Sequence, residues 1–152
     1  MAYKSIDEIK RQMERYCAYQ ERSHFQVEKK LRDLGVIPEV LDHIVVHLIQ
    51  ENFLNEERFA RGYVRGKFYQ NKWGKIKIIQ GLKHHRIHQK LIEKAITEID
   101  EDDYLKTLHQ LIEKKCNRLT GGFKQKKAKI IRYLYQKGYA YSEYAGLLKE
   151  NC

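Results

Sequence analysis

The sequence is poor in proline and has no long apolar run. It contains one proline in 152 residues, although proline is frequent in the turns of loop-rich proteins. No stretch approaches the ~20 consecutive apolar residues that a membrane-spanning helix needs, and residues 1–7 lack the apolar core of a signal peptide. We therefore expect a cytoplasmic protein with no membrane contact.

Cysteines are also few, and they form no recognisable pair. Cys17, Cys116 and Cys152 are odd in number, and none of them belongs to a C-x-x-C motif. Disulfide-stabilised and zinc-binding domains have cysteines in paired, characteristic spacings. The pattern indicates free thiols in a reducing cytoplasm, with structural or incidental roles.

The usual motifs of catalysis are missing. There is no G-x-x-x-x-G-K-[ST] phosphate loop, so ATP chemistry would belong to a partner, and no G-x-S-x-G nucleophile motif. His43 and His47 have the i, i+4 spacing of metal ligands, but Ile44 stands where H-E-x-x-H has its general base. We expect no enzyme, and no metal, cofactor or small-molecule substrate.

Positive charge, by contrast, is abundant and unevenly distributed. The chain carries 30 Lys and Arg against 20 Asp and Glu, a net charge of +10. Residues 1–52 have 8 basic against 9 acidic side chains, residues 53–99 have 11 against 4, and residues 100–152 have 11 against 7. Such a field attracts polyanions within a Debye length. The middle and the end of the chain are therefore expected to face nucleic acid or an acidic protein surface.

Apolar residues recur with helical periodicity along the chain, which predicts an all-α fold. The pattern also repeats, because Leu31, Leu82 and Leu134 are 51 and 52 residues apart and other positions fall into the same register. The further sets are Phe25, Ile76 and Ala128; Val27, Ile78 and Ile130; Val36, Ile87 and Tyr139; Leu41, Ile92 and Tyr144; and Val45, Ile96 and Leu148. We predict three tandem three-helix repeats, residues 1–52, 53–99 and 100–152, in an elongated, curved array.

Helix start and stop signals support this division. Ser23 stands three residues before a glutamine, as in a capping box, and Pro38 suits the first turn of a helix. Gly35 and Gly138 suit the left-handed C-cap of the second helix in the first and third repeats. Arg86 holds this position in the second repeat, where a left-handed conformation would cost about 1–2 kcal/mol. We expect that helix to end differently.

Two other clusters are interpreted as structural. The acidic run at 100–103 fits a helix start, where the helix dipole favours carboxylates. The tyrosines of the last repeat could stack on bases, but most of them fall at core or packing positions. They are Tyr133, Tyr135, Tyr139, Tyr141 and Tyr144.

The strongest functional pattern is a set of cations in the second and third repeats. At about 100° per residue, the first four of them share one side of a helix that Asn55 can cap. We predict that the set contacts phosphates or acidic side chains of a partner; the alternative is a solvated helix face, which charged stripes usually are. The set comprises Arg58, Arg61, Arg65, Lys72, Lys75, Lys77, Lys126, Lys129 and Arg132.

The run FLNEERFARGYVR from Phe53 to Arg65, followed by WGKIKI and LK, resembles the signature of the RecX family of bacterial recombination regulators. That signature also has an Asn or Asp cap, Arg-Phe-Ala, an aromatic-Val-Arg segment and a Gly-basic-Ile restart. The sequence departs from it at His84-His85-Arg86, where the family commonly has a basic residue followed by glycine.

The resemblance implies three three-helix repeats that bind in the groove of a RecA recombinase filament on DNA. It implies a regulator, most often an inhibitor, of the filament's ATP hydrolysis and strand exchange in recombination and DNA repair. The partners would be the RecA filament and single- or double-stranded DNA within or beside it. The alternative from charge alone is a free-standing DNA-binding module that needs no recombinase.

Overall fold

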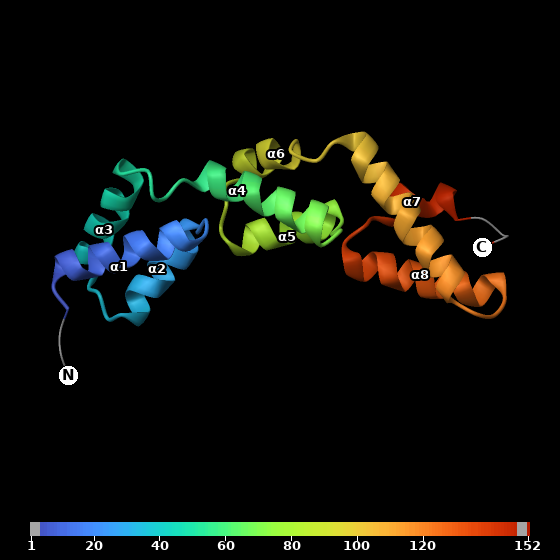
Figure 1. Ribbon diagram of the computed structural model, residues 1–152, viewed down its shortest axis with the longest axis horizontal. Helices are drawn as coiled ribbons and strands as arrows, with labels where there is room; N and C mark the ends of the chain where they lie inside the picture. Colours follow the sequence, from blue (N-terminus) through green and yellow to red (C-terminus); the bar gives the residue numbers. More distant parts are fainter. Residues whose placement is uncertain (1–3, 149–151) are drawn as a thin grey trace.

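The computed structural model describes residues 4–148 and 152, and these residues form nine α-helices, one π-helical turn and one 3₁₀ turn without any strand. The helices gather in three groups that follow one another along a shallow arc, with the two termini at opposite ends (Figure 1). The predicted all-α fold of tandem three-helix repeats in an elongated, curved array is thereby confirmed.

The first repeat contains α1 (Ile6–Tyr19), α2 (His24–Asp33) and α3 (Pro38–Gln50). The predicted capping box at the start of α2 is complete. The Ser23 hydroxyl accepts a hydrogen bond from the backbone N–H of Gln26, and the Gln26 side chain accepts one from the backbone N–H of Ser23. The local signals in the sequence therefore fix where these helices begin.

The second repeat contains α4 (Glu56–Arg65), the π-helical turn η1 (Gly66–Gln70), α5 (Lys75–His84) and α6 (Gln89–Ile96). Asn55 caps α4, because its side-chain oxygen accepts a hydrogen bond of 2.9 Å from the backbone N–H of the third helical residue.

The π-helical turn breaks the predicted basic stripe. A π turn closes i→i+5 hydrogen bonds, one residue more than an α turn, so the residues after it leave the register of the preceding helix. Lys72 follows the turn and lies outside any helix, with a φ of 63°. The prediction that Lys72 continues the stripe of Arg58, Arg61 and Arg65 is therefore wrong.

The third repeat contains α7 (Glu101–Arg118), α8 (Phe123–Lys137), the short α9 (Tyr141–Tyr144) and the 3₁₀ turn η2 (Ala145–Leu147). The Asp100 carboxylate caps α7 by accepting a 3.0 Å hydrogen bond from the backbone N–H of Asp103, the last residue of the acidic run. This confirms the structural interpretation of that run.

Equivalent positions of the three repeats are buried alike. Leu31, Leu82 and Leu134 lie in α2, α5 and α8, and all three have no solvent exposure. The set one turn earlier in each of these helices, Val27, Ile78 and Ile130, is buried as well. The second helix of each repeat thus presents the same two positions to its core.

The three repeats do not share one core. The first repeat has a cluster of its own, centred on Met13, Val27 and Leu31. A second, larger cluster runs without interruption through the second and third repeats, from Phe59 in α4 to Tyr144 in α9. The molecule therefore consists of a two-repeat block with a continuous core and a first repeat with a separate core.

Backbone contact joins the second repeat to the third. The N–H of Gly74 donates to the carbonyl of Lys137 at 2.8 Å, and the N–H of Ile76 donates to the carbonyl of Gly138 at 3.0 Å. A Cβ on Gly74 would overlap the Gly138 carbonyl, so these two backbone segments approach closely only because position 74 is glycine. Tyr104 also accepts a 3.0 Å hydrogen bond from the N–H of Lys75.

The junction between the first and second repeats is more polar. Ser23 Oγ lies 2.9 Å from His85 Nδ1, and the His24 N–H donates to Glu56 Oε1 at 2.8 Å. The Arg86 guanidinium covers the ring of Phe25 at 4.8 Å. Such an interface resembles those between domains that move relative to one another.

Arg86 also contradicts the expectation that α5 ends differently from its equivalents. Its φ is 58°, and the N–H of Ile87 donates to the Leu82 carbonyl just as the N–H of Val36 donates to the Leu31 carbonyl in the first repeat. The left-handed cap is retained without glycine, and the contact of the Arg86 side chain with the first repeat offsets part of its cost.

Candidate partner-binding surface

The arginines of α4 are held in ion pairs with neighbouring elements. Arg58 Nε lies 2.6 Å from Glu21 Oε1, and its other two nitrogens donate to Asn52 and to backbone carbonyls of the same segment. This guanidinium joins the end of α1 and the segment before α4. Its hydrogen-bonding capacity is largely used within the chain.

Arg61 and Arg65 share one carboxylate at the end of α6. Arg61 Nη1 lies 3.0 Å from Glu98 Oε1, and Arg65 Nη1 lies 3.3 Å from Glu98 Oε2. Hydrogen bonds from Arg61, and then from Arg65, hold the pKa of Glu98 below its ordinary value against the opposing effect of burial. The stripe thus fastens α4 to α6, and its charge is partly neutralised.

The lysines around the start of α5 have different surroundings. Lys75 Nζ lies 2.7 Å from Glu101 Oε1 and 4.5 Å from the Tyr104 ring centroid. Lys77 Nζ lies 4.3 Å from the Trp73 ring, and no acidic side chain in residues 4–148 or 152 pairs with it. Lys77, unlike Lys75, offers a charge that a partner can use.

Two of the three cations predicted on α8 are exposed. Lys129 and Arg132 lie one turn apart, and no described carboxylate lies within ion-pair distance of either. Lys126 instead donates to the carbonyl of Cys152 at 3.0 Å, so it holds the end of the chain. Of the three cations predicted on α8, only Lys129 and Arg132 are therefore exposed and free of a described ion pair.

Lys77 and Arg132 border neighbouring grooves between α5, α8 and α9. One groove has a volume of about 630 Å³ and is lined mainly by apolar atoms of Ile76, Tyr135 and Tyr141 together with Arg132. The adjoining groove, about 270 Å³, shares Ile76 and Tyr135 and adds Lys77. We call the five residues Ile76, Lys77, Arg132, Tyr135 and Tyr141 the α5–α8 surface.

Exposed aromatic area marks this surface. The side chains of Tyr135 and Tyr141 are 78% and 54% exposed, and Ile76 is 43% exposed. Apolar side chains gathered around a groove and bordered by cations are typical of protein interaction sites. Sequence reasoning assigned most of the tyrosines to the core, which is right for Tyr139 and Tyr144 but not for these two.

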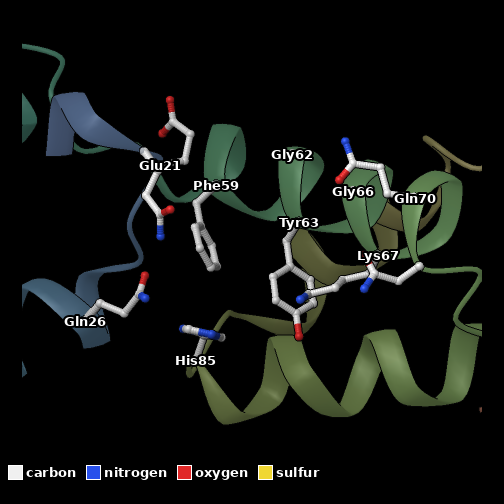
Figure 2. Close-up of a pocket in the computed structure, with 11 residues that line it drawn as sticks. Glu21, Gln26, Phe59, Gly62, Tyr63, Gly66, Lys67, Gln70 and His85 are labelled. Atoms are coloured by element: carbon white, nitrogen blue, oxygen red, sulfur yellow. The ribbon is translucent and has the colours of Figure 1, made fainter.

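A second hollow, of about 410 Å³, lies between the first and second repeats. Figure 2 shows Phe59 and Tyr63 projecting into it from α4, with Gln26 and His85 on the opposite side. Gly66, the first residue of η1, also lines the hollow, and a Cβ there would meet nothing within 4 Å. The hollow lies at the interface that Ser23, His24, Glu56 and His85 form between these repeats, which we call the polar joint.

His85 occupies the centre of this joint. Its ring centroid lies 4.9 Å from that of Phe59 and 5.7 Å from that of Tyr63. Burial, assisted by the charges of His84 and Lys67, lowers the pKa of His85 below 6.5. The contact to Ser23 is therefore made by a neutral imidazole at neutral pH.

The cysteines differ from the prediction of three free thiols. Cys116 at the end of α7 and Cys152 form a disulfide, with their Cα atoms 5.2 Å apart. Sequence spacing missed this pair because the fold returns residue 152 to α7 across 36 positions. Cys17 is free and buried, and burial raises the pKa of its thiol to about 11.

The histidine pair of α3 has a carboxylate neighbour in another helix. His47 Nε2 lies 2.8 Å from Glu14 Oε2, so this histidine joins α3 to α1. Among residues 4–148 and 152, no group of three or more His, Cys, Asp or Glu side chains is arranged to hold a metal ion. No helix in the described part of the chain is long and apolar enough to cross a membrane.

Comparison with known families gives two matches, one to each of the last two repeats. The family model described as "RecX, second three-helix domain" matches residues 55–96, and the model described as "RecX, third three-helix domain" matches residues 101–143. Together they cover more than half of the chain. The chain belongs to the RecX family. The matched segments contain α4 to α8 and the first three residues of α9, and hence the whole α5–α8 surface.

Similarity to individual RecX proteins extends over most of the chain. The regulatory protein RecX of Lactococcus lactis is 30% identical over 132 residues, covering 84% of this chain and 48% of that protein. RecX of Clostridium acetobutylicum is 26% identical over 130 residues, covering 82% of this chain and 60% of its own length. The chain thus spans about half the length of the curated relatives it matches.

A solved structure agrees with the fold over nearly the full chain. The crystal structure of RecX from Lactobacillus salivarius superposes with a TM-score of 0.84 at 26% identity, and the match covers 96% of both chains. The relatives from Clostridium acetobutylicum and Lactococcus lactis are both named as regulatory proteins.

Proposed function

We propose that this protein regulates recombination by binding a RecA recombinase filament on DNA and lowering the filament's ATP hydrolysis and strand exchange. The proposal places it in the bacterial cytoplasm. Of the repeats 1–52, 53–99 and 100–152, the second and third make the main contact with the filament. Family membership supports a regulatory role.

The observation that carries the proposal is the α5–α8 surface on an extended array. Ile76, Tyr135 and Tyr141 expose apolar area beside Lys77 and Arg132, as an acidic and partly apolar protein surface would require. Tyr and Arg are also the residue types that most often dominate binding energy at interfaces. Lys129, one turn from Arg132, extends the charge along α8.

The other predicted cations act indirectly in this proposal. Arg58, Arg61 and Arg65 hold α4 against its neighbours through Glu21 and Glu98. Lys75 and Lys126 hold the start of α5 and the end of the chain in the same way. They position the surface, and the exposed cations contact the partner.

Regulation follows from spanning several recombinase subunits at once. The block of the second and third repeats has one continuous core, whereas the polar joint lets the first repeat adjust. A ligand that binds one arrangement of subunits better than another increases the population of that arrangement. ATP turnover falls when the favoured arrangement is inactive.

The test compares binding to RecA filaments with binding to naked DNA by co-sedimentation. The variant Lys77→Glu/Arg132→Glu should lose filament binding, while Arg11→Glu/Lys29→Glu, with the same charge change on the first repeat, should retain it. Both control residues are basic and outside the described ion pairs. Filament binding that survives reversal of Lys77 and Arg132 would contradict the proposed surface.

A second candidate function is DNA binding without a recombinase, which the net charge of +10 favours. In that case the protein would bind naked DNA as tightly as filaments. Its affinity would fall with salt at a slope of about −0.9 per phosphate contact on duplex DNA. The same co-sedimentation experiment separates the two functions.

A further inference from the structure

A pocket lined by cations lies where the second repeat meets the third. It has a volume of about 290 Å³ and opens between α7, the end of α8 and the segment that links η1 to α5. Five basic side chains border it: Lys72, Lys114, Lys115, Arg118 and Lys137. We call it the junction pocket. It lies apart from the apolar groove of the α5–α8 surface, and no residue borders both.

The charges of the junction pocket are not balanced within the described chain. Among residues 4–148 and 152, no carboxylate borders the pocket, and none lies within ion-pair distance of its five cations. The arginines of α4 show the opposite arrangement, because each of them has a glutamate partner. Lys114 and Arg118 even stand at i and i+4 on α7, where like charges disfavour the helix.

Several contacts fix the geometry of the pocket. Tyr139 Oη donates to the Lys72 carbonyl at 2.8 Å, and Lys137 Nζ donates to the Asn71 carbonyl at 2.8 Å. These bonds hold Lys72 in the left-handed region, with a φ of 63°, which is unfavourable for a residue other than glycine. Strained backbone that surrounding contacts maintain is concentrated at functional sites.

The uncharged polar groups of the pocket include further hydrogen-bond donors. Thr107 contributes a hydroxyl and Gln110 an amide. Lys115 lies 4.3 Å above the Tyr133 ring, which keeps its ammonium at the pocket wall. Burial and the charges of Lys77 and Lys72 lower the pKa of Lys137, so an anion in the pocket would relieve an existing repulsion.

We propose that the junction pocket binds the phosphate backbone of a nucleic acid. Five cations exceed what a single carboxylate side chain can neutralise, whereas successive phosphates along a strand each carry one negative charge. Lysine and arginine suit phosphate oxygens, and no acidic side chain of residues 4–148 borders the pocket to repel them. The inference extends the proposed function, because a filament formed on DNA presents such phosphates.

The test measures binding of a fluorescent single-stranded oligonucleotide, and of its duplex, to the full chain without recombinase. Lys114→Ala/Arg118→Ala should weaken binding about tenfold at low salt, and the loss of two phosphate contacts should reduce the slope of log K against log salt by about 1.4 on the single strand and about 1.8 on the duplex. The control Lys29→Ala/Arg11→Ala removes the same charges from the first repeat and should leave both values nearly unchanged. Lys114→Arg/Arg118→Lys, which keeps the charges, should retain most of the binding.

A second arm uses inorganic phosphate. It should raise the melting temperature of the wild type but not that of Lys114→Ala/Arg118→Ala. Oligonucleotide binding equal to the wild type in this variant overturns the proposal, and a phosphate effect alone would assign the pocket to free phosphate instead. Because the oligonucleotide assay contains no recombinase, a negative result would overturn the junction-pocket proposal only. Binding to the RecA filament is tested separately by co-sedimentation.

Discussion

Replacing Gly74 by alanine should destabilise the junction of the second and third repeats specifically. Gly74 has an ordinary backbone conformation, with φ −75° and ψ 164°, so alanine can adopt it. The added Cβ, however, would overlap the Gly138 carbonyl and lie 2.6 Å from the backbone nitrogen of Tyr139. Backbone atoms cannot move aside as a flexible side chain can, so the repeats must separate or strain.

Gly122 provides a matched control for this change. It occupies the same N-cap position, on α8, with φ −75° and ψ 168°, and a Cβ there meets nothing within 4 Å. Both substitutions therefore alter the helix cap alike. Only Gly74→Ala creates overlap, which costs about 1–3 kcal/mol in packed sites. The difference between the two variants isolates the cost at the junction.

Urea unfolding measures the effect. Gly74→Ala should lower the free energy of unfolding by about 1–3 kcal/mol more than Gly122→Ala, a midpoint shift of about 1 M at a typical slope. Trp73, the single tryptophan, precedes Gly74 and reports on the junction by fluorescence. Equal unfolding free energies for the two variants would refute the close backbone approach.

Two further predictions concern the polar joint and the disulfide. Burial lowers the pKa of His85 below 6.5 in the folded chain, so the unfolded chain binds more protons at this residue as the pH falls. The contribution of the neutral His85 to the free energy of unfolding is therefore fully present above pH 6.5 and is lost as the pH drops below it. His85→Asn should make this acid-side loss shallower in urea midpoints measured from pH 7.5 to 5.5, and an unchanged slope would contradict the role of His85. Reducing the Cys116–Cys152 disulfide, which spans 36 residues, should lower the unfolding free energy by about 2–4 kcal/mol. Cys116→Ser should show the same value with or without reductant, and a wild type insensitive to reductant would exclude a stabilising disulfide.

Features encoded by neighbouring residues could be predicted from the sequence. The capping box at Ser23 and the cap at Asn55 depend on residues three positions away, and both form as expected. The equivalence of Leu31, Leu82 and Leu134 follows from periodicity, and all three are fully buried. These sequence signals predict the structure correctly because helix starts and amphipathic faces depend only on residues close together in the chain.

The candidate site could not be predicted in full, because a helical projection shows only contacts within one helix and not those between distant segments. Glu21 and Glu98 are both 37 residues away from the arginines they pair with, Arg58 and Arg61. The sequence therefore predicted that the charges of Arg58 and Arg61 are available to a partner, whereas the structure pairs both with glutamates of the same chain. The π-helical turn likewise displaced Lys72 by adding one residue to a single turn, which composition does not reveal.

The surfaces now proposed combine elements that are distant in the chain. The α5–α8 surface joins Ile76 to Tyr135 and Tyr141, and the junction pocket joins Lys72 to Lys114 and Lys137. Exposed and buried tyrosines have the same spacing pattern here, since Tyr135 is exposed while Tyr139, one turn later, is buried. Only the fold distinguishes them.

The central claim, regulation of a recombinase filament, is tested most directly by the rate of DNA-dependent ATP hydrolysis by RecA. The full chain, titrated to saturation, should lower this rate, and Lys77→Glu/Arg132→Glu should be much less effective than Arg11→Glu/Lys29→Glu at equal helicity. An ATPase rate that stays unchanged at saturating protein would contradict the claim.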